Sequence, residues 1–123
     1  AVADGSGKLY YFNQTAQQLL GKGVVPNVNS EEIAQVYQTY IAGTNQLYPV
    51  EKLPMVRALK GETSSVEDIE IHQEDKIIPL EVWGTPIYDK DGKVNFAIVV
   101  FRDITERKKA EADRIKLTTE LIQ

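Results

Sequence analysis

The chain has 123 residues, 42% of them hydrophobic, no cysteine and a formal net charge of −4. This length fits one domain, and the hydrophobic content is enough for a core without disulfides or a structural metal. The lack of cysteine excludes disulfides, thiolate metal sites, a cysteine nucleophile and any cofactor held through sulfur. Nucleic acid and acidic lipid are unexpected partners, because both require a basic protein surface.

The longest unbroken apolar run spans residues 96–101, far below the roughly 20 residues of a membrane-spanning helix. No signal-peptide pattern opens the chain. We therefore expect a soluble, cytoplasmic domain without direct membrane contact. It is expected to be a fragment of a longer parent protein, whose own association with a membrane stays open.

The first part of the chain predicts a hairpin and then two helices. A glycine-rich turn at residues 4–8 separates two short apolar or aromatic stretches. Asn13 has the character of a helix cap, and Gly21 ends the short helix that follows. A second helix is expected to begin at Ser30, with acidic residues in its first turn. Its apolar face at helical spacing consists of Ile33, Val36, Tyr37, Tyr40 and Ile41.

The second part predicts a short helix and a set of strands. Pro54 opens the helix and Gly61 ends it. Stretches rich in β-branched and aromatic residues then predict three antiparallel strands at 66–72, 77–88 and 94–102. The last of these is apolar at nearly every position, which is typical of a central strand with both faces covered. Helices are expected on one face, and a flanking helix or a second copy of the chain on the other.

A charged stretch without glycine or proline follows the last strand and predicts a helix that starts directly from it. Asp103 and Glu106 have the spacing of a capping box at its start. Apolar residues on one side of this helix predict a seam for a partner helix. The seam consists of Ile104, Ile115 and Ile122, with Glu111 and Thr118 at intervening positions. Upstream, Pro79 and Pro86 lack a backbone donor. They are expected near strand ends or bulges, or where the nitrogen side of the residue faces away from a neighbouring strand.

Seven short stretches occur in a characteristic order: DGSGK (4–8), YFNQ (11–14), LG (20–21), LPMVRALKGE (53–62), GTPI (84–87), DGK (91–93) and DITER (103–107). Together they resemble a PAS domain of bacterial multidomain signalling proteins, and the last stretch is the most discriminating. The resemblance implies an α+β fold with a five-stranded antiparallel sheet, helices packed on one face and a C-terminal signalling helix. It also implies a pocket that in some members binds haem, flavin or a small metabolite.

The resemblance further implies a regulatory sensor and dimerisation domain at residues 1–103 and a linker helix at residues 104–123. That helix would start a coiled coil to an output domain, such as a histidine kinase of a two-component system or a cyclic-dinucleotide enzyme. A homodimer is the expected state, and the expected signal junction is Asp103, Ile104 and Thr105. The same three residues are also compatible with a simple helix cap, and both interpretations stay open.

Aromatic residues and the single methionine provide a candidate ligand pocket, because pockets are mostly apolar with a few polar groups. The candidate residues are Tyr37, Tyr40, Tyr48, Met55, Trp83 and Phe96. An unidentified small molecule is the ligand this interpretation implies. Ordinary core packing is the simpler explanation of the same residues.

His72 is the only histidine, and at a strand end it is not expected to bind metal or haem. Without cysteine, a covalent flavin adduct is excluded, so no cofactor is expected. The acidic pairs at 67–68 and 74–75 have the character of surface charge, and no catalytic residue is predicted. A ligand-free dimerisation module and a small cone-shaped α+β enzyme are the alternatives to a sensor.

Overall fold

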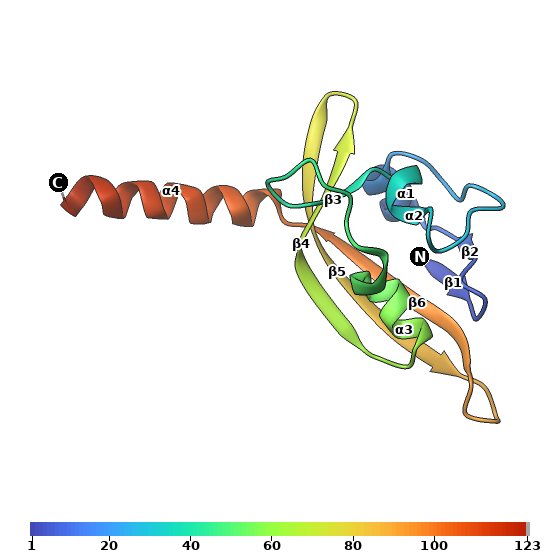
Figure 1. Cartoon of the computed structure of the whole chain (residues 1–123). Coiled ribbons are helices and arrows are strands. Elements are labelled where there is room, and N and C mark those ends of the chain that lie inside the picture. Colours follow the sequence, from blue (N-terminus) through green and yellow to red (C-terminus); the bar gives the residue numbers. More distant parts are fainter. Residues whose placement is uncertain (123) are drawn as a thin grey trace.

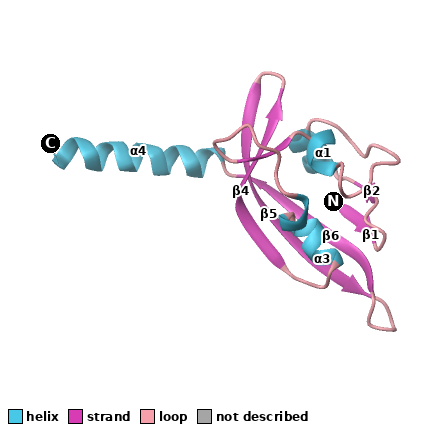
Figure 2. Ribbon diagram, in the orientation of Figure 1, coloured by secondary structure: helices cyan, strands magenta, loops and turns pink. Residues whose placement is uncertain are grey.

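One antiparallel sheet of six strands organises the molecule, and three short helices lie over one of its faces (Figure 2). The computed structural model describes residues 1–122, with side chains through Lys116. The expected α+β architecture is confirmed, but the expectation of five strands is one strand short. Across the sheet the order is β2 (Leu9–Tyr11), β1 (Val2–Asp4), β6 (Val94–Asp103), β5 (Lys76–Tyr88), β4 (Ser64–Gln73) and β3 (Thr39–Ile41).

The hairpin of β1 and β2 is closed by the side chain of Asp4. Its Oδ1 accepts hydrogen bonds from the Ser6 amide at 3.0 Å, the Ser6 hydroxyl at 2.6 Å and the Lys8 amide at 3.0 Å. The bond from the Ser6 hydroxyl is the main reason that the pKa of Asp4 lies below its ordinary value. The predicted hairpin is therefore confirmed.

Helix α1 (Gln14–Leu20) begins and ends where the sequence predicts. The Asn13 side chain accepts a hydrogen bond from the Ala16 amide at 2.9 Å, which satisfies a free donor of the first turn. Gly21 adopts a left-handed backbone with φ of 81°, a conformation open to glycine without strain. The helix turns Ala16 and Leu20 into the core.

The second helix is far shorter than expected, and the prediction of a helix from Ser30 through Ile41 is wrong. Only α2 (Ile33–Val36) is helical. The turn before it is closed by Asn29, whose side chain accepts a hydrogen bond from the Glu32 amide at 3.1 Å. Ser30 therefore does not have the capping role that its position suggested.

The chain leaves α2 because Gln38 adopts a left-handed backbone with φ of 50°. It then continues as β3, whose residues pair with Ile69, Glu70 and Ile71 of β4. Pairing with a strand edge satisfies backbone donors and acceptors that a longer helix would satisfy internally. The apolar residues that are spaced like one helix between Ile33 and Ile41 thus belong partly to helix α2 and partly to strand β3.

Helix α3 (Pro54–Leu59) follows a single 3-10 turn, η1 (Val50–Lys52), and packs directly on the sheet. The predicted start at Pro54 is confirmed, and Gly61 has a left-handed φ of 89° just beyond the end. A Cβ atom added to Gly84 of β5 would lie 2.3 Å from the carbonyl oxygen of Pro54. The backbone of α3 therefore touches the backbone of β5 at this point.

The three long strands predicted in the second part of the chain are confirmed, and β6 lies between β1 and β5 as a central strand. Alternate residues of β5 face opposite sides, with Leu80 and Val82 buried under the helices. On the outer side of β6, Ile98 and Val100 are 39% and 52% exposed. The described residues thus cover only one face of the central strand.

Both prolines of the sheet lie within β5. Pro86 lies beside the register shift at Ile87 and Tyr88, which agrees with the expected bulge. Pro79 lies close to the turn between β4 and β5, opposite Glu70. Its carbonyl oxygen accepts a hydrogen bond from the Ile104 amide at 3.0 Å.

Helix α4 (Thr105–Ile122) starts directly after β6 and extends away from the sheet (Figure 1). The prediction that no flexible linker separates strand and helix is confirmed. Among the described helices, none combines the length and the apolar character needed to cross a membrane.

Candidate functional site

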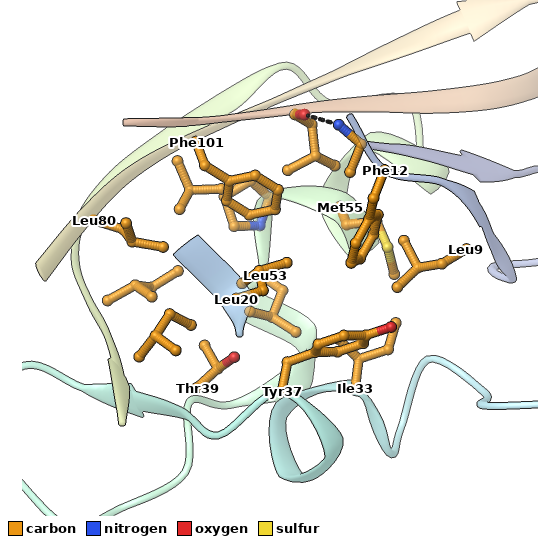
Figure 3. Close-up of a pocket in the computed structure, with 16 residues that line it drawn as sticks. Leu9, Phe12, Leu20, Ile33, Tyr37, Thr39, Leu53, Met55, Leu80 and Phe101 are labelled. Atoms are coloured by element: carbon orange, nitrogen blue, oxygen red, sulfur yellow. Dashed lines mark hydrogen bonds between the residues drawn. The ribbon is translucent and has the colours of Figure 1, made fainter. Parts of the chain in front are cut away.

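An apolar cavity of about 60 Å³ lies between the sheet and the helices (Figure 3). Phe101 and Tyr37 lie on opposite sides of it, and Met55 and Phe12 form another part of the wall. Its lining comes from every layer of the fold, so the cavity exists only after the helices have packed on the sheet. The lining residues are Ala1, Leu9, Phe12, Leu20, Ile33, Tyr37, Thr39, Leu53, Pro54, Met55, Ile69, Ile71, Leu80, Val82, Val99 and Phe101.

Two of the six residues proposed from the sequence, Tyr37 and Met55, line this cavity. The structure places the other four elsewhere. Tyr40 lies on the edge strand β3, where its ring stacks on His72 with centroids 4.0 Å apart. Tyr48 is buried but does not line the cavity.

Trp83 and Phe96 lie on the outer face of the sheet. Trp83 stands between the inward-facing Val82 and the buried Gly84, and it is paired with the exposed Val100. The ring of Phe96 contacts that of Tyr10, with centroids 5.8 Å apart. Because successive side chains of a strand point to opposite faces, neither aromatic residue reaches the cavity.

The lining residues that the aromatic set missed are mainly aliphatic. In β5 positions 78, 80 and 82 are all apolar and face inward, whereas the positions between them face outward. This period of two is visible in the sequence. Alternation identifies such a face, although it does not indicate which lining positions border empty space. Thr39 is also part of the lining and had no distinguishing signal in the sequence.

Two polar side chains line the otherwise apolar wall, and one of them is already engaged. The hydroxyl of Tyr37 donates to the Gly23 carbonyl and accepts from the Val25 amide, each at 3.0 Å. Burial raises the pKa of Tyr37 above its ordinary value. Thr39 is the buried polar residue at the cavity, so its hydroxyl is the group best placed to contact a bound molecule.

Tyr48 is held by Asp68, a residue of the bulged part of β4. Its hydroxyl donates to Asp68 Oδ1 at 2.8 Å. Burial, followed by the hydrogen bond and the negative charge of Asp68, raises the pKa of Tyr48 well above the ordinary 10.0. Folding therefore favours the protonated phenol. The raised pKa of Tyr48 therefore adds to the free energy of unfolding. This contribution is fully present below the ordinary pKa of tyrosine and is lost as the pH rises through the pKa of the folded state.

We expect Tyr48→Phe to lower the free energy of unfolding by about 1 kcal/mol at neutral pH, because one hydrogen bond is lost. Above about pH 10 the difference from the unmodified chain should narrow, since phenylalanine has no proton to lose. Urea denaturation at a series of pH values measures both quantities. A difference that stays constant through the alkaline range contradicts the assignment.

The junction between β6 and α4 is stabilised by Asp103. Its Oδ1 accepts from the Thr105 amide at 2.8 Å and from the Thr105 hydroxyl at 2.5 Å. Both bonds go to the residue two positions on, so this contact is an Asx-type turn rather than the expected capping box with Glu106. Ile104, the residue between Asp103 and Thr105 in the sequence, is buried.

The predicted helix seam is changed by the burial of Ile104. This side chain packs inside the domain and is not available to a partner helix. Ile115 lies on the exposed surface of α4. The side chain of Ile122 lies outside the described residues.

His72 contacts a carboxylate of its own strand. Its Nε2 lies 3.0 Å from Oε1 of Glu70, and its ring stacks on Tyr40. These contacts give the side chain a local structural role at the β3 edge of the sheet. Within the described residues, no group of three or more histidine and carboxylate side chains is arranged to hold a metal ion.

Comparison with known proteins identifies one family. A family model with the description PAS domain matches residues 1–106. The match extends over the whole sheet, the three covering helices and the junction at residues 103–105. No curated protein matches the chain.

Proposed function

The chain belongs to the PAS domain family, and we propose that it is a sensor whose cavity, when occupied, alters the start of α4. A PAS domain is a sensory or regulatory module, generally without catalytic activity. The observation that carries the proposal is continuity: Leu80 and Phe101 line the cavity, and the strands that hold them lead to the junction. The carbonyl oxygen of Pro79 on β5 accepts the hydrogen bond from the Ile104 amide, so the start of α4 is bound directly to β5.

The ligand that fits the cavity is small and mostly apolar, with one polar atom opposite Thr39. Pockets for larger ligands measure roughly 300–1,000 Å³, whereas this cavity measures about 60 Å³. Haem and flavin exceed this space, so the proposed ligand is a smaller molecule. A ligand of this kind would press on the strands as well as on the helices.

Native mass spectrometry of the purified chain tests for the ligand. We expect a retained small molecule in the unmodified chain and its loss in Thr39→Val, which keeps the side-chain shape and removes the hydroxyl. Thr15→Val, on the exposed side of α1, is the matched control. A preparation with a haem or flavin absorption band would overturn the ligand class.

The modest volume of the cavity favours a second candidate function, a ligand-free interaction module. In that case a partner protein or a second copy would supply the signal. Mass spectrometry would then show no bound molecule, and Thr39→Val would be indistinguishable from the unmodified chain.

The output in the parent protein is proposed to be a histidine kinase or a cyclic-dinucleotide enzyme, reached through α4. In this arrangement Asp103 and Thr105 set the path of the helix. We expect Asp103→Ala to lower the free energy of unfolding of the chain by only about 1 kcal/mol. In the full-length parent the same variant should alter the regulation of output. The stabilising effect of the cap is similar in size to an allosteric coupling free energy, which is about 1 to 3 kcal/mol.

Urea denaturation and output activity, measured for Asp103→Ala and Thr105→Ala, test this junction. Glu106→Ala, at an exposed neighbouring position, is the control. Normal regulation combined with a large loss of stability would mean that the junction is purely structural.

We further propose that a second copy of the chain covers the outer face of the sheet. Ile98 and Val100 lie exposed at the centre of this face, beside the partly exposed Trp83 and Phe96. A contiguous apolar surface of this kind is typical of a protein interface. If the same sheet face of both copies pairs in this way, the dimer contains both α4 helices.

Sedimentation at micromolar concentration is expected to show a dimer, and Ile98→Asp should weaken it at least about tenfold, since burial of one apolar side chain contributes about 1.5 to 3 kcal/mol. Asn45→Asp, in an exposed loop, adds the same charge as a control. Equal dissociation of both variants, or a monomer at all concentrations, would exclude this interface.

A further inference from the structure

Arg107, in the first turn of α4, forms ion pairs with two strands of the sheet. Its Nη2 lies 3.3 Å from Oε1 of Glu67 on β4, and its Nη1 lies 3.6 Å from Oε1 of Glu81 on β5. The forked guanidinium can contact two carboxylates at once, which the single ammonium of lysine does less well. One side chain of the exit helix therefore connects two neighbouring strands.

The described part of α4 contacts the domain mainly near its beginning. Ile104 is buried just before the helix, and Arg107 is partly covered. All described residues from 108 to 116 are exposed. A single attachment at Ile104 would let the helix rotate about that point. A second attachment is needed to set the direction of the helix, and the ion pairs of Arg107 provide it.

The two carboxylates differ in their contact with water. The side chain of Glu81 is 12% exposed, whereas that of Glu67 is 58% exposed. A charge held away from water is screened less, so Glu81 should be the stronger partner. Arg102 is the cross-strand neighbour of Glu81, but its side chain is exposed.

The contacts of Arg107 are longer than tight charge-assisted hydrogen bonds, which measure about 2.7–2.9 Å. The buried Nη2 atom has no hydrogen-bond partner among the described residues, although it forms the ion pair with Glu67. Charge attraction without a fixed hydrogen-bond geometry holds the helix and still tolerates a shift. This is the property needed in a contact that can be released.

Both carboxylates lie within two residues of the cavity wall in the sequence. Glu81 stands between Leu80 and Val82, which line the cavity. Glu67 lies in the bulge between Val66 and the cavity-lining Ile69. A change in the spacing of β4 and β5 at the cavity therefore changes the spacing of the two carboxylates that Arg107 contacts.

We propose that Arg107 is a latch that sets the direction of α4 according to the relative position of β4 and β5. With both contacts made, the helix keeps one direction. When the strands separate or shift, the latch opens and the helix pivots about Ile104. The latch gives the proposed sensor a specific means of output, but its existence can be tested without any ligand.

The lack of cysteine in the chain makes a direct measurement simple. Lys60→Cys at the end of α3 and Ala112→Cys on α4, both exposed, provide two spin-label positions. Pulsed electron paramagnetic resonance on labelled chain diluted with unlabelled chain reports the distance within one molecule. We expect one narrow distance peak in this background.

Arg107→Gln should abolish the single narrow peak, and Glu81→Gln should broaden it more than Glu67→Gln. The chain should stay folded, although Arg107→Gln should lower the melting temperature, because Glu81 is only 12% exposed and loses the partner of its charge. Lys108→Gln removes a neighbouring exposed charge and should leave the peak unchanged. The exchange pair Arg107→Glu with Glu81→Arg should restore a narrow peak that Arg107→Glu alone lacks.

A narrow peak that survives Arg107→Gln would overturn the latch, as would equal broadening by Lys108→Gln. Failure of the exchange pair in a folded chain would also overturn the pairing with Glu81. None of these outcomes depends on a ligand, so the latch can fail while the sensor function stands, and the reverse also holds.

Discussion

Gly84→Ala is expected to destabilise the protein by about 3 kcal/mol, the upper end of the usual range for overpacking. The added Cβ would lie 2.3 Å from the Pro54 carbonyl oxygen and 2.6 Å from the Pro54 carbonyl carbon. Both atoms belong to the backbone, so no side-chain rotation relieves the contact. Relief requires α3 to move away from β5, which would also open the cavity that Pro54 and Met55 line.

Circular dichroism during urea denaturation measures this loss, and Gly23→Ala provides the control. A Cβ at Gly23 would lie 3.7 Å or more from its nearest neighbours, all in the side chain of Gln17. We expect this control to stay within about 1 kcal/mol of the unmodified chain. A stable Gly84→Ala would show that α3 does not pack on β5 at this distance.

Leu80→Ala is expected to lower the free energy of unfolding by about 2 to 5 kcal/mol, as large-to-small changes in a core do. Leu80 is 0% exposed and lies on a central strand under the helices. Its side chain also borders the cavity, so the truncation adds its lost volume to existing empty space. If the surrounding core partly collapses into the space left by Leu80, the loss of stability should lie at the lower end of the range of about 2 to 5 kcal/mol.

The same variant should gain affinity for a small apolar probe. Dry apolar cavities of about 150 Å³ bind benzene, and the cavity of the unmodified chain is smaller, at about 60 Å³. Saturating benzene should therefore raise the melting temperature of Leu80→Ala and leave that of the unmodified chain nearly unchanged. The matched control is Ile77→Ala on the same strand, 56% exposed, which should cost no more than about 0.5 kcal/mol.

If Leu80→Ala and Ile77→Ala lose equal stability, the assignment of the inner and outer faces of β5 is incorrect. If benzene stabilises the unmodified chain as strongly as the variant, the cavity is larger or more adaptable than the structure indicates. The two comparisons test the packing and the volume separately.

Local signals in the sequence determined most of the elements. Asn13 and Gly21 bound α1, and Pro54 opens α3, because caps, left-handed glycine and an N-terminal proline act within a few residues. The three long strands followed from β-branched composition and from the turn before β6. The immediate start of α4 after β6 was also visible, since no glycine or proline separates them.

Tertiary contacts decided the segment from Ile33 to Ile41. Its apolar spacing suits a helix, but the edge of β4 offers hydrogen-bond partners that residues 39–41 use instead. The availability of that edge depends on how the rest of the sheet is arranged, over distances that no local pattern records. The sixth strand and the position of Thr39 at the cavity both result from this choice.

Tertiary structure also decided which aromatic residues approach the cavity. The sequence alternation of β5 and β6 separates two faces, yet both faces carry large apolar residues, so it does not tell which face the helices cover. The close contact of α3 with Gly84 selects the face with Leu80 and Val82. Trp83 and Phe96 consequently lie outside, and the ion pairs of Arg107 with Glu67 and Glu81 likewise form only when two strands and the exit helix meet.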